Sequence, residues 1–261
     1  MSSAITIGGT EIPLYGICFW LGVLVSAGLL LALRTKRSIP WYDAAYSGVF
    51  TMIGAMIGSK GLFILVSWNE IIAAGIPWID VIKGGFVFYG GLLGGLAGLI
   101  TYVRIYKLNV YDFMDIYALA IPIGHAIGRV GCFFAGCCYG IPYDGIFSHV
   151  YTEAAGQTPL HIPLLPIQLI EASCLFLLFT VNLFLFMRAP HRRGVPLSIY
   201  ICAYPIIRFV LEFFRGDRER GILLGLSTSQ WVSLILLFGV VLYRLRCAGR
   251  PSPACVRHDR S

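Results

Sequence analysis

Apolar residues gather into long runs along this chain, and short polar segments separate the runs. Seven runs approach the ~20 residues that a helix needs to cross the hydrocarbon core of a bilayer. They are predicted at roughly 12–33, 43–67, 85–103, 112–130, 166–187, 195–214 and 227–243. The pattern therefore predicts an all-α integral membrane protein with about seven transmembrane helices.

Basic residues that follow alternate runs predict the orientation of the chain. Those after the first, third, fifth and seventh runs are Arg34, Lys36, Arg37, Arg104, Lys107, Arg188, Arg192, Arg193, Arg244, Arg246, Arg250, Arg257 and Arg260. Loops rich in lysine and arginine stay on the cytoplasmic side. We therefore expect the N-terminus outside and the C-terminus in the cytoplasm. No basic segment precedes the first run, which argues against a cleavable signal peptide.

Composition agrees with a membrane protein and limits the number of domains. The 261 residues are 57% hydrophobic and 13% charged, against roughly 25% charged in soluble domains. We expect one transmembrane domain over 1–245, with an external connection or head at 130–165, and a basic cytoplasmic tail at 246–261. The net charge of +7 lies in loops rather than in a basic polar module, which excludes nucleic acid as a partner.

A second set of cations does not fit the flanking pattern. Its members lie within runs or toward the predicted outer side, and they are Lys60, Lys83, Arg129, Arg208, Arg215, Arg218 and Arg220. Charges inside a bilayer are costly and mark pairs or ligand sites. Arg129 and Arg208 indicate a shared anionic ligand, because a guanidinium fork suits phosphate. The alternative is that each arginine pairs with an internal carboxylate, Glu171 or Glu212, and both can hold together.

Three cysteines follow Arg129 where the fourth run ends, namely Cys132, Cys137 and Cys138. One interpretation is a disulfide from Cys132 to either of the others, since the predicted outer side permits disulfides. A metal site is a second interpretation, although the spacing matches no common zinc pattern. A redox pair or a transient thiol acceptor is the third. The sequence indicates no cofactor. We expect the remaining cysteines to pack within spans or to lie in the tail.

The segment Gly128-Arg129-Val130-Gly131-x-Phe133-x-x-Gly136-x-x-Tyr139-Gly140 resembles the signature of the prolipoprotein diacylglyceryl transferase family. Five further segments resemble that family in order and spacing. They are Leu14-Tyr15-Gly16, Gly84-Gly85-Phe86-Val87-Phe88-Tyr89-Gly90-Gly91, Pro166-x-Gln168-x-x-Glu171, Tyr204-x-x-x-Arg208-x-x-x-Glu212-Phe213-Phe214-Arg215 and Gly225-Leu226-Ser227-x-x-Gln230. The glycine-rich run from Gly84 to Gly98 lies within a span, so we expect it to pack helices rather than bind a nucleotide.

The resemblance implies a function and a set of site residues. The diacylglyceryl group of phosphatidylglycerol would move to the lipobox cysteine thiol of a prolipoprotein signal peptide, and glycerol phosphate would leave. The reaction would occur at the outer face of the bacterial cytoplasmic membrane, among membrane lipids. Arg129 and Arg208 would hold the phosphate, and Tyr204 would position it. The other positions assigned to substrate binding are Tyr15, Gly131, Gln168, Glu171, Glu212, Cys132 and Cys137.

Three positions depart from the family pattern. Tyr89 stands where the family has histidine, Cys132 where it has asparagine, and Cys137 where it has glutamate. The base that activates the thiol is therefore expected to be Tyr89 or His125. His125 lies four residues before Arg129, and histidine titrates near neutral pH. An interior, hydrogen-bonded histidine is the alternative for His125.

Two other classes of protein compete with the transferase. One is a lipid-binding or thiol-redox membrane protein that keeps the fold without transfer activity. The other is a seven-span transporter. The transporter is disfavoured because the charged residues cluster at one side and no pair of interrupted helices is evident.

Overall fold

The computed structural model describes residues 4–7, 10–75, 77–154, 158–189, 192–217 and 222–248. Its helices are α1 (Leu14–Leu33), α2 (Trp41–Val66), α3 (Trp68–Ala73), α4 (Trp78–Lys83), α5 (Phe88–Ile105), α6 (Val110–Ala135), α7 (Ile167–Arg188), α8 (Val195–Glu212) and α9 (Thr228–Ala248), with a 3-10 turn η1 (Arg34–Arg37). The described residues also form three two-stranded antiparallel sheets: β1 (Ala4–Ile7) with β2 (Thr10–Pro13), β3 (His149–Val150) with β4 (Pro163–Leu164), and β5 (Ile222–Leu223) with β6 (Leu226–Ser227). The expected all-α class is confirmed.

The membrane spans are confirmed in part. Within the described residues, five helical segments are long and apolar enough to cross a bilayer: Leu14–Arg37, Trp41–Val66, Val110–Ala135, Ile167–Arg188 and Val195–Glu212. The third and seventh expected runs also form apolar helices, but shorter ones, at Tyr89–Ile105 and Thr228–Leu242. Arg218, Arg220 and most of the predicted tail at 246–261 lie outside the described residues, as does the side chain of Lys83.

The fourth expected run ends later than the sequence suggested. Helix α6 continues past the predicted end at residue 130 to Ala135, so Gly131 and Cys132 are helical. It stops where Gly136 adopts a φ of +64°. That left-handed conformation is the usual end of a helix and favours glycine.

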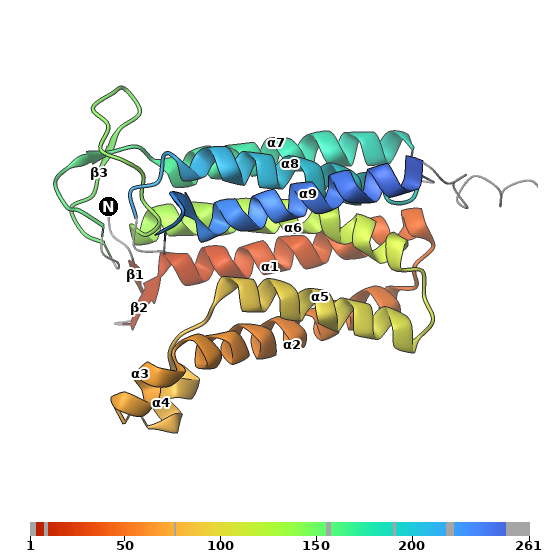
Figure 1. The fold of residues 1–261 in the computed structure, drawn as a ribbon, viewed down its shortest axis with the longest axis horizontal. Helices are drawn as coiled ribbons and strands as arrows, with labels where there is room; N and C mark the ends of the chain where they lie inside the picture. Colours follow the sequence, from red (N-terminus) through yellow and green to blue (C-terminus); the bar gives the residue numbers. More distant parts are fainter. Residues whose placement is uncertain are drawn as a thin grey trace, which may run out of the picture. The chain divides into compact units, whose positions relative to one another are not determined.

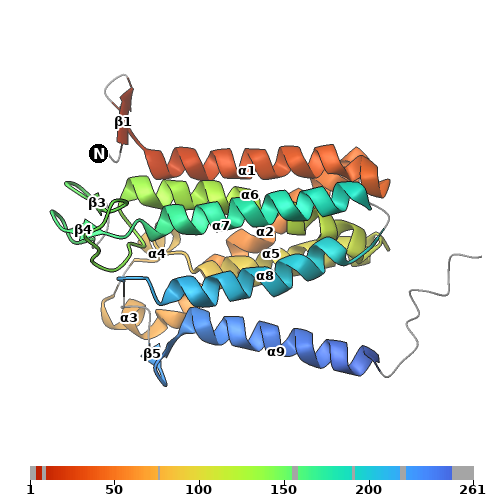
Figure 2. The same cartoon turned by 90° about the horizontal axis from the view of Figure 1, so that it is seen from above.

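The chain divides into two compact units, and the first comprises residues 1–26 and 118–261. Its helices α7, α8 and α9 run alongside one another (Figures 1 and 2). The start of α1 packs on α6 through small residues. A Cβ on Gly22 would meet the carbonyl oxygen of Gly124 at 2.8 Å, and the Ser26 hydroxyl donates to the carbonyl of Ala120. Close approach of small residues is how membrane helices associate.

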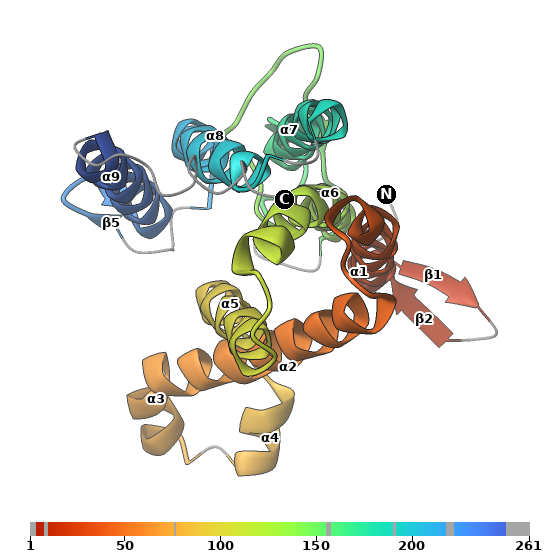
Figure 3. The same ribbon diagram turned by 90° about the vertical axis from the view of Figure 1, so that its right-hand side faces the viewer.

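The second unit comprises residues 27–117 and is organised around the pair α2 and α5, which Figure 3 shows beside each other. Glycines at intervals of four residues line both sides of the contact. A Cβ on Gly54 or Gly58 of α2 would collide with the α5 backbone at Gly94 or Gly90. The expectation that this glycine run packs helices is confirmed for Gly90, Gly94 and Gly98, whereas Gly84 and Gly85 precede α5.

Two cations of the second unit are held by internal acceptors. Arg37 ends η1 in a buried ion pair, with its Nη2 at 2.5 Å from Asp115 Oδ2. Lys60 donates to the carbonyls of Val81 and Gly85, at 2.9 Å each, and to that of Gly84. These carbonyls belong to the last turn of α4 and the segment after it, where a cation is favoured by the helix dipole. These hydrogen bonds give Lys60 a structural role.

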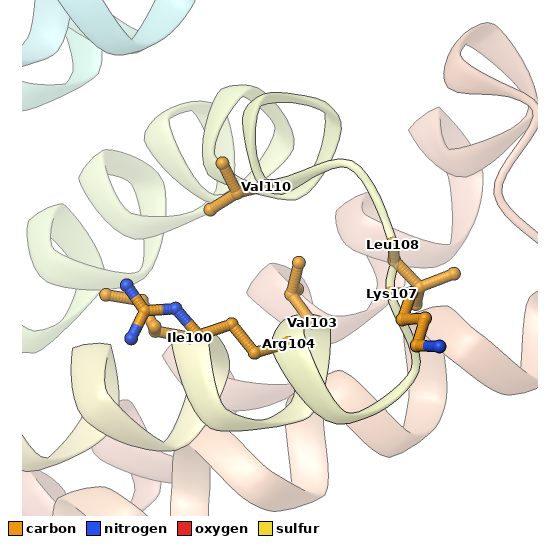
Figure 4. A pocket seen from close by; sticks show the side chains of 6 residues that line it. All are labelled: Ile100, Val103, Arg104, Lys107, Leu108 and Val110. Atoms are coloured by element: carbon orange, nitrogen blue, oxygen red, sulfur yellow. The ribbon is translucent and has the colours of Figure 1, made fainter.

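A pocket in the second unit lies at the C-terminal end of α5 (Figure 4). It is lined by Ile100, Val103, Arg104, Lys107, Leu108 and Val110. These side chains are aliphatic apart from two cations, and none is a carboxylate, thiol or imidazole. The pocket therefore does not identify a catalytic centre.

Candidate active site

A single buried carboxylate bridges the two arginines that the sequence singled out. Glu171 of α7 is 1% exposed. Its Oε1 lies 3.1 Å from Arg129 Nη2 on α6, and its Oε2 lies 3.4 Å from Arg208 Nη1 on α8. The two arginines therefore converge, as expected, and the alternative of pairing with an internal carboxylate is also realised. All three residues belong to the first unit.

Local sequence places Glu171 at this junction. Pro166 precedes α7, and Gln168 and Glu171 follow three residues apart, on one face of the helix. Both side chains are buried. Nearby, Ala126 of α6 packs against Ala172 and Leu175 of α7. Helices α6 and α7 thus meet through small and aliphatic residues, and Tyr204 of α8 packs against them.

Arg208 has further partners from α8 and α9. Its Nη2 lies 2.7 Å from Glu212 Oε2, one turn later on the same helix, and 3.2 Å from the hydroxyl of Ser229. Ser229 was not predicted from the sequence. It is positioned by a capping box at the start of α9. There the Ser227 amide donates to Gln230 Oε1 and the Gln230 amide donates to Ser227 Oγ. The Gly225-Leu226-Ser227-x-x-Gln230 segment is thus a helix N-terminus.

His125 is a partner of Arg129. Its Nε2 accepts a hydrogen bond of 3.2 Å from Arg129 Nε, so that nitrogen carries no proton in this arrangement. The ring also meets Tyr204 edge-on, with centroids 5.6 Å apart. Tyr204 is in turn stacked on Tyr200 at 5.6 Å. The interior, hydrogen-bonded histidine that the sequence left open is the one observed.

Tyr15 and Gly131 lie where α1 approaches α6. A Cβ on Gly131 would meet Cys18 Cβ at 2.8 Å and Tyr15 Cα at 3.5 Å. The glycine is therefore required by close helix packing. The Tyr15 side chain is 45% exposed. Contact of either residue with substrate stays a prediction.

Arg215 joins the network from the segment after α8. Its guanidinium forms a fork with Asp217, with Nε at 2.9 Å from Oδ1 and Nη2 at 2.6 Å from Oδ2. Arg215 Nε also lies 4.0 Å from Glu212 Oε2. Backbone hydrogen bonds from Ile141 to Phe214 and from Gly216 to Tyr139 align this segment with the one that follows the cysteines. Arg215 is thereby paired with Gly140, two residues after Cys138.

The end of α6 folds the cysteines together. The amide of Gly136 donates to the Phe133 carbonyl, and the amide of Cys137 donates to the Cys132 carbonyl. This pattern is a Schellman motif, which brings the first and last of its six residues into contact. Gln168 Nε2 donates to the Cys137 carbonyl at 2.8 Å, and the Thr158 hydroxyl donates to the Gly136 carbonyl. Gln168 therefore supports the turn rather than the arginine network.

The three thiols lie close together. The Sγ atoms of Cys132, Cys137 and Cys138 lie within 4.8 Å of one another, and the expected disulfide is not formed. Hydrogen bonds with the thiols of Cys132 and Cys137 lower the pKa of the Cys138 thiol. The positive charges of Arg215 and Arg129 lower it further.

Tyr89 belongs to the second unit, at the start of α5, where its side chain is half-buried. The remaining predicted site residues lie in the first unit. The role of Tyr89 as a base stays a prediction.

Charges in the first unit's network balance one another. Three cations face three carboxylates, and they are Arg129, Arg208, Arg215, Glu171, Glu212 and Asp217. Buried charges persist only when paired and hydrogen-bonded. Such a network within apolar helices is typical of a membrane protein that handles a charged group.

The fold and this network define a helical membrane protein with a buried arginine–carboxylate site. The prolipoprotein diacylglyceryl transferase family matches residues 2–245. A phosphatidylglycerol–prolipoprotein diacylglyceryl transferase 2 of Clostridium perfringens is 31% identical over 240 residues, covering 91% of this chain and 92% of that protein. The transferase of Clostridium tetani is 31% identical over 242 residues, covering 91% and 94%. That of Dehalococcoides mccartyi is 31% identical over 251 residues, covering 93% of each. The chain belongs to the prolipoprotein diacylglyceryl transferase family.

Proposed function

We propose that this chain transfers the diacylglyceryl group of phosphatidylglycerol to the cysteine thiol of a prolipoprotein. Family membership favours this reaction over the lipid-binding or redox alternative. The observation that carries the proposal is the convergence of Arg129 and Arg208 on Glu171. It places two fixed guanidinium groups from different helices at one buried point.

The arginines suit the leaving group of this reaction. Sulfur attacks the glyceryl carbon of the lipid, a C–S bond forms, and the C–O bond to phosphate breaks. The electron pair of that bond stays on the phosphate of glycerol phosphate. Negative charge therefore grows at the phosphate, and preorganised cations in a water-poor site stabilise it most. Arg129 and Arg208 take this role in the proposal.

Glu171, Glu212 and Ser229 hold the arginines in place before the lipid arrives. A guanidinium held on two sides loses little rotamer freedom when it binds phosphate. Arg215 adds a further donor, because its buried Nη1 makes no hydrogen bond to a described oxygen or nitrogen. We assign His125 to positioning Arg129, since its Nε2 already accepts from that side chain.

The topology and the acceptor complete the proposal. We propose seven spans formed by α1, α2 and α5 to α9, with the N-terminus outside and the C-terminus in the cytoplasm. The acceptor is then the lipobox cysteine of a signal peptide at the outer face of the bacterial cytoplasmic membrane. Residues 130–165 form the external head of a single transferase domain over 1–245. The basic segments after alternate helices support this orientation.

Lysine substitution of the arginines tests the phosphate role. Arg129→Lys and Arg208→Lys keep the charge and remove the fork, so both should lose binding of phosphatidylglycerol by at least about tenfold. Arg104→Lys, which changes an exposed arginine of the second unit, is the matched control. Binding is measured by titrating the detergent-solubilised chain with phosphatidylglycerol. Unchanged affinity in both variants would exclude the arginines from the phosphate site.

A further inference from the structure

Three thiols converge beside the arginine network, and the reaction gives them no role so far. Cys132 lies three residues after Arg129 on α6, one turn along the helix. Cys137 and Cys138 follow the Schellman turn, and their Sγ atoms lie within 4.8 Å of each other and of Cys132 Sγ. All three are partly buried.

The separations fit a metal bound by three thiolates. Zinc–sulfur bonds of about 2.3 Å in a tetrahedron place sulfur atoms about 3.8 Å apart. The sulfur atoms therefore lie at most about 1 Å farther apart than a tetrahedral zinc site requires. Thiolates are soft ligands and favour zinc or copper(I) over calcium or magnesium. Zinc and copper(I) are each consistent with a ligand set of three cysteines.

The backbone keeps the thiols together without a disulfide. The hydrogen bond from the Cys137 amide to the Cys132 carbonyl fixes the first pair. Cys138 adopts a φ of +57°, a left-handed conformation that residues with a side chain rarely adopt. Gln168 and Thr158 hold the intervening carbonyls. Side chains from two other segments thus stabilise the turn.

Charge around the cluster matches a metal–thiolate group. Zinc with three thiolates carries a net charge of −1, and a fourth thiolate makes it −2. Arg215 is paired with Gly140 across an isolated β-bridge, two residues after Cys138, and Arg129 lies one turn before Cys132 on α6. Such cations balance the excess negative charge in a buried site.

We propose that Cys132, Cys137 and Cys138 bind one zinc ion whose fourth position takes the thiol of the acceptor cysteine. This inference rests on the proposed transfer function. Zinc sites with three protein ligands keep an open position for substrate, and a thiol bound there is deprotonated. The cluster would thereby supply thiol activation from within the first unit, where His125 already accepts a hydrogen bond from Arg129.

The step balances without an oxidant or reductant. The acceptor thiol binds zinc and releases its proton to solvent. The bound sulfur then attacks the glyceryl carbon, the C–O bond to phosphate breaks, and glycerol phosphate leaves from the arginines. The product is a thioether, which is a weaker ligand than a thiolate and leaves the fourth position.

Metal content and cobalt substitution test the site independently of activity. The chain purified without chelator should hold one zinc ion per molecule by elemental analysis. Cobalt(II) should replace it and give sulfur-to-cobalt charge-transfer absorption. Serine substitution of any one ligand should weaken cobalt(II) binding by at least about 100-fold; the variants are Cys132→Ser, Cys137→Ser and Cys138→Ser. Loss of a residue that only supports a ligand lowers metal affinity by about 10–100-fold, so a loss of 100-fold or more indicates a direct ligand. Cys174→Ser, a free and partly buried cysteine of α7, should bind as the unmodified chain does.

Alkylation of the unmodified chain avoids the risk that a variant fails to fold. A zinc chelator should raise the labelling rate of the three cluster cysteines and leave that of Cys174 unchanged. Zinc-independent labelling, a disulfide within the cluster, or binding of copper(I) without zinc would each overturn the proposal. Zinc binding without any transfer supports the metal site and refutes the proposed function. Full transfer by the zinc-free chain supports the function and overturns the thiol-activating role.

Discussion

Glu171 is the residue on which the arginine network depends. It is almost fully buried and contacts Arg129 through one oxygen and Arg208 through the other. Each arginine has other partners, but the carboxylate is the contact that they share. Removal of Glu171 would therefore affect both phosphate-binding groups at once.

The first prediction concerns Glu171→Gln. Glutamine keeps the shape and loses the charge, which leaves two buried guanidinium groups poorly compensated. Breaking a buried ion pair in this way lowers the free energy of unfolding by about 3–5 kcal/mol. We also expect the rate of diacylglyceryl transfer to fall by at least about 100-fold. Unfolding in detergent and kcat/KM for a lipobox peptide are the measurements. Glu153→Gln, at an exposed carboxylate of the head, serves as control, and equal effects of the two variants would refute the assignment.

The second prediction separates positioning from base catalysis at His125. The side-chain oxygen of glutamine can accept the hydrogen bond from Arg129 Nε, whereas alanine cannot. His125→Gln should therefore retain most of the transfer rate, and His125→Ala should lose at least about tenfold. If both variants are equally inactive while phosphatidylglycerol binding is intact, His125 is the base.

At the residue scale, the sequence identified the charged groups but not their connections. Arg129, Arg208 and Glu171 were recognisable because charges inside apolar runs are rare. The sharing of one carboxylate by both arginines depends on how α6, α7 and α8 meet, which no local pattern encodes. Ser229 was missed because a serine near a helix start usually signals a cap.

At the element scale, glycine spacing governs the pair α2 and α5. Gly58 lies against the α5 backbone, so an added methyl has no space. Gly61, on the same helix, has nothing within 4 Å of the position of its Cβ. The two positions form a matched pair within one element.

The third prediction uses that pair. Gly58→Ala should destabilise the chain by about 1–3 kcal/mol or more, because overpacking forces the helices apart. Gly61→Ala should be neutral, or stabilising by up to about 1 kcal/mol, since alanine favours helix. Unfolding of both variants in detergent compares them directly. A loss of stability at Gly61 as large as that at Gly58 would contradict the packing role.

Apolar runs predicted the long helices because hydrophobicity sustained over a bilayer's width is itself the signal. The short helices α3 and α4 lack that signal and were not predicted. The hydrogen bonds from Lys60 to carbonyls in the last turn of α4 and the segment after it join residues 21 to 25 positions apart, which is beyond any helical period. Gly136 alone indicated that α6 could end in a Schellman turn. The convergence of the three thiols depends on the hydrogen bonds of that turn, which the sequence does not show.

At the scale of the whole molecule, the proposed topology gives the fourth prediction. A fluorescent protein fused after residue 248 should fold and fluoresce in bacteria, because it folds in the cytoplasm. An alkaline phosphatase fused there should be inactive, because that enzyme needs the disulfides of the outer side. The reverse pair of results would contradict an odd number of spans with the N-terminus outside.

The chemistry of the whole chain is tested most directly by following both products of one reaction. The purified chain is incubated with phosphatidylglycerol vesicles and a lipobox peptide, and mass spectrometry records peptide and lipid together. The account predicts that the peptide gains a diacylglyceryl group on its cysteine sulfur as a thioether, with one glycerol phosphate released per modified peptide. The same peptide with serine in place of cysteine should gain nothing. A chain that binds phosphatidylglycerol but leaves the cysteine peptide unmodified, or that attaches a fatty acyl group as a thioester, would contradict it.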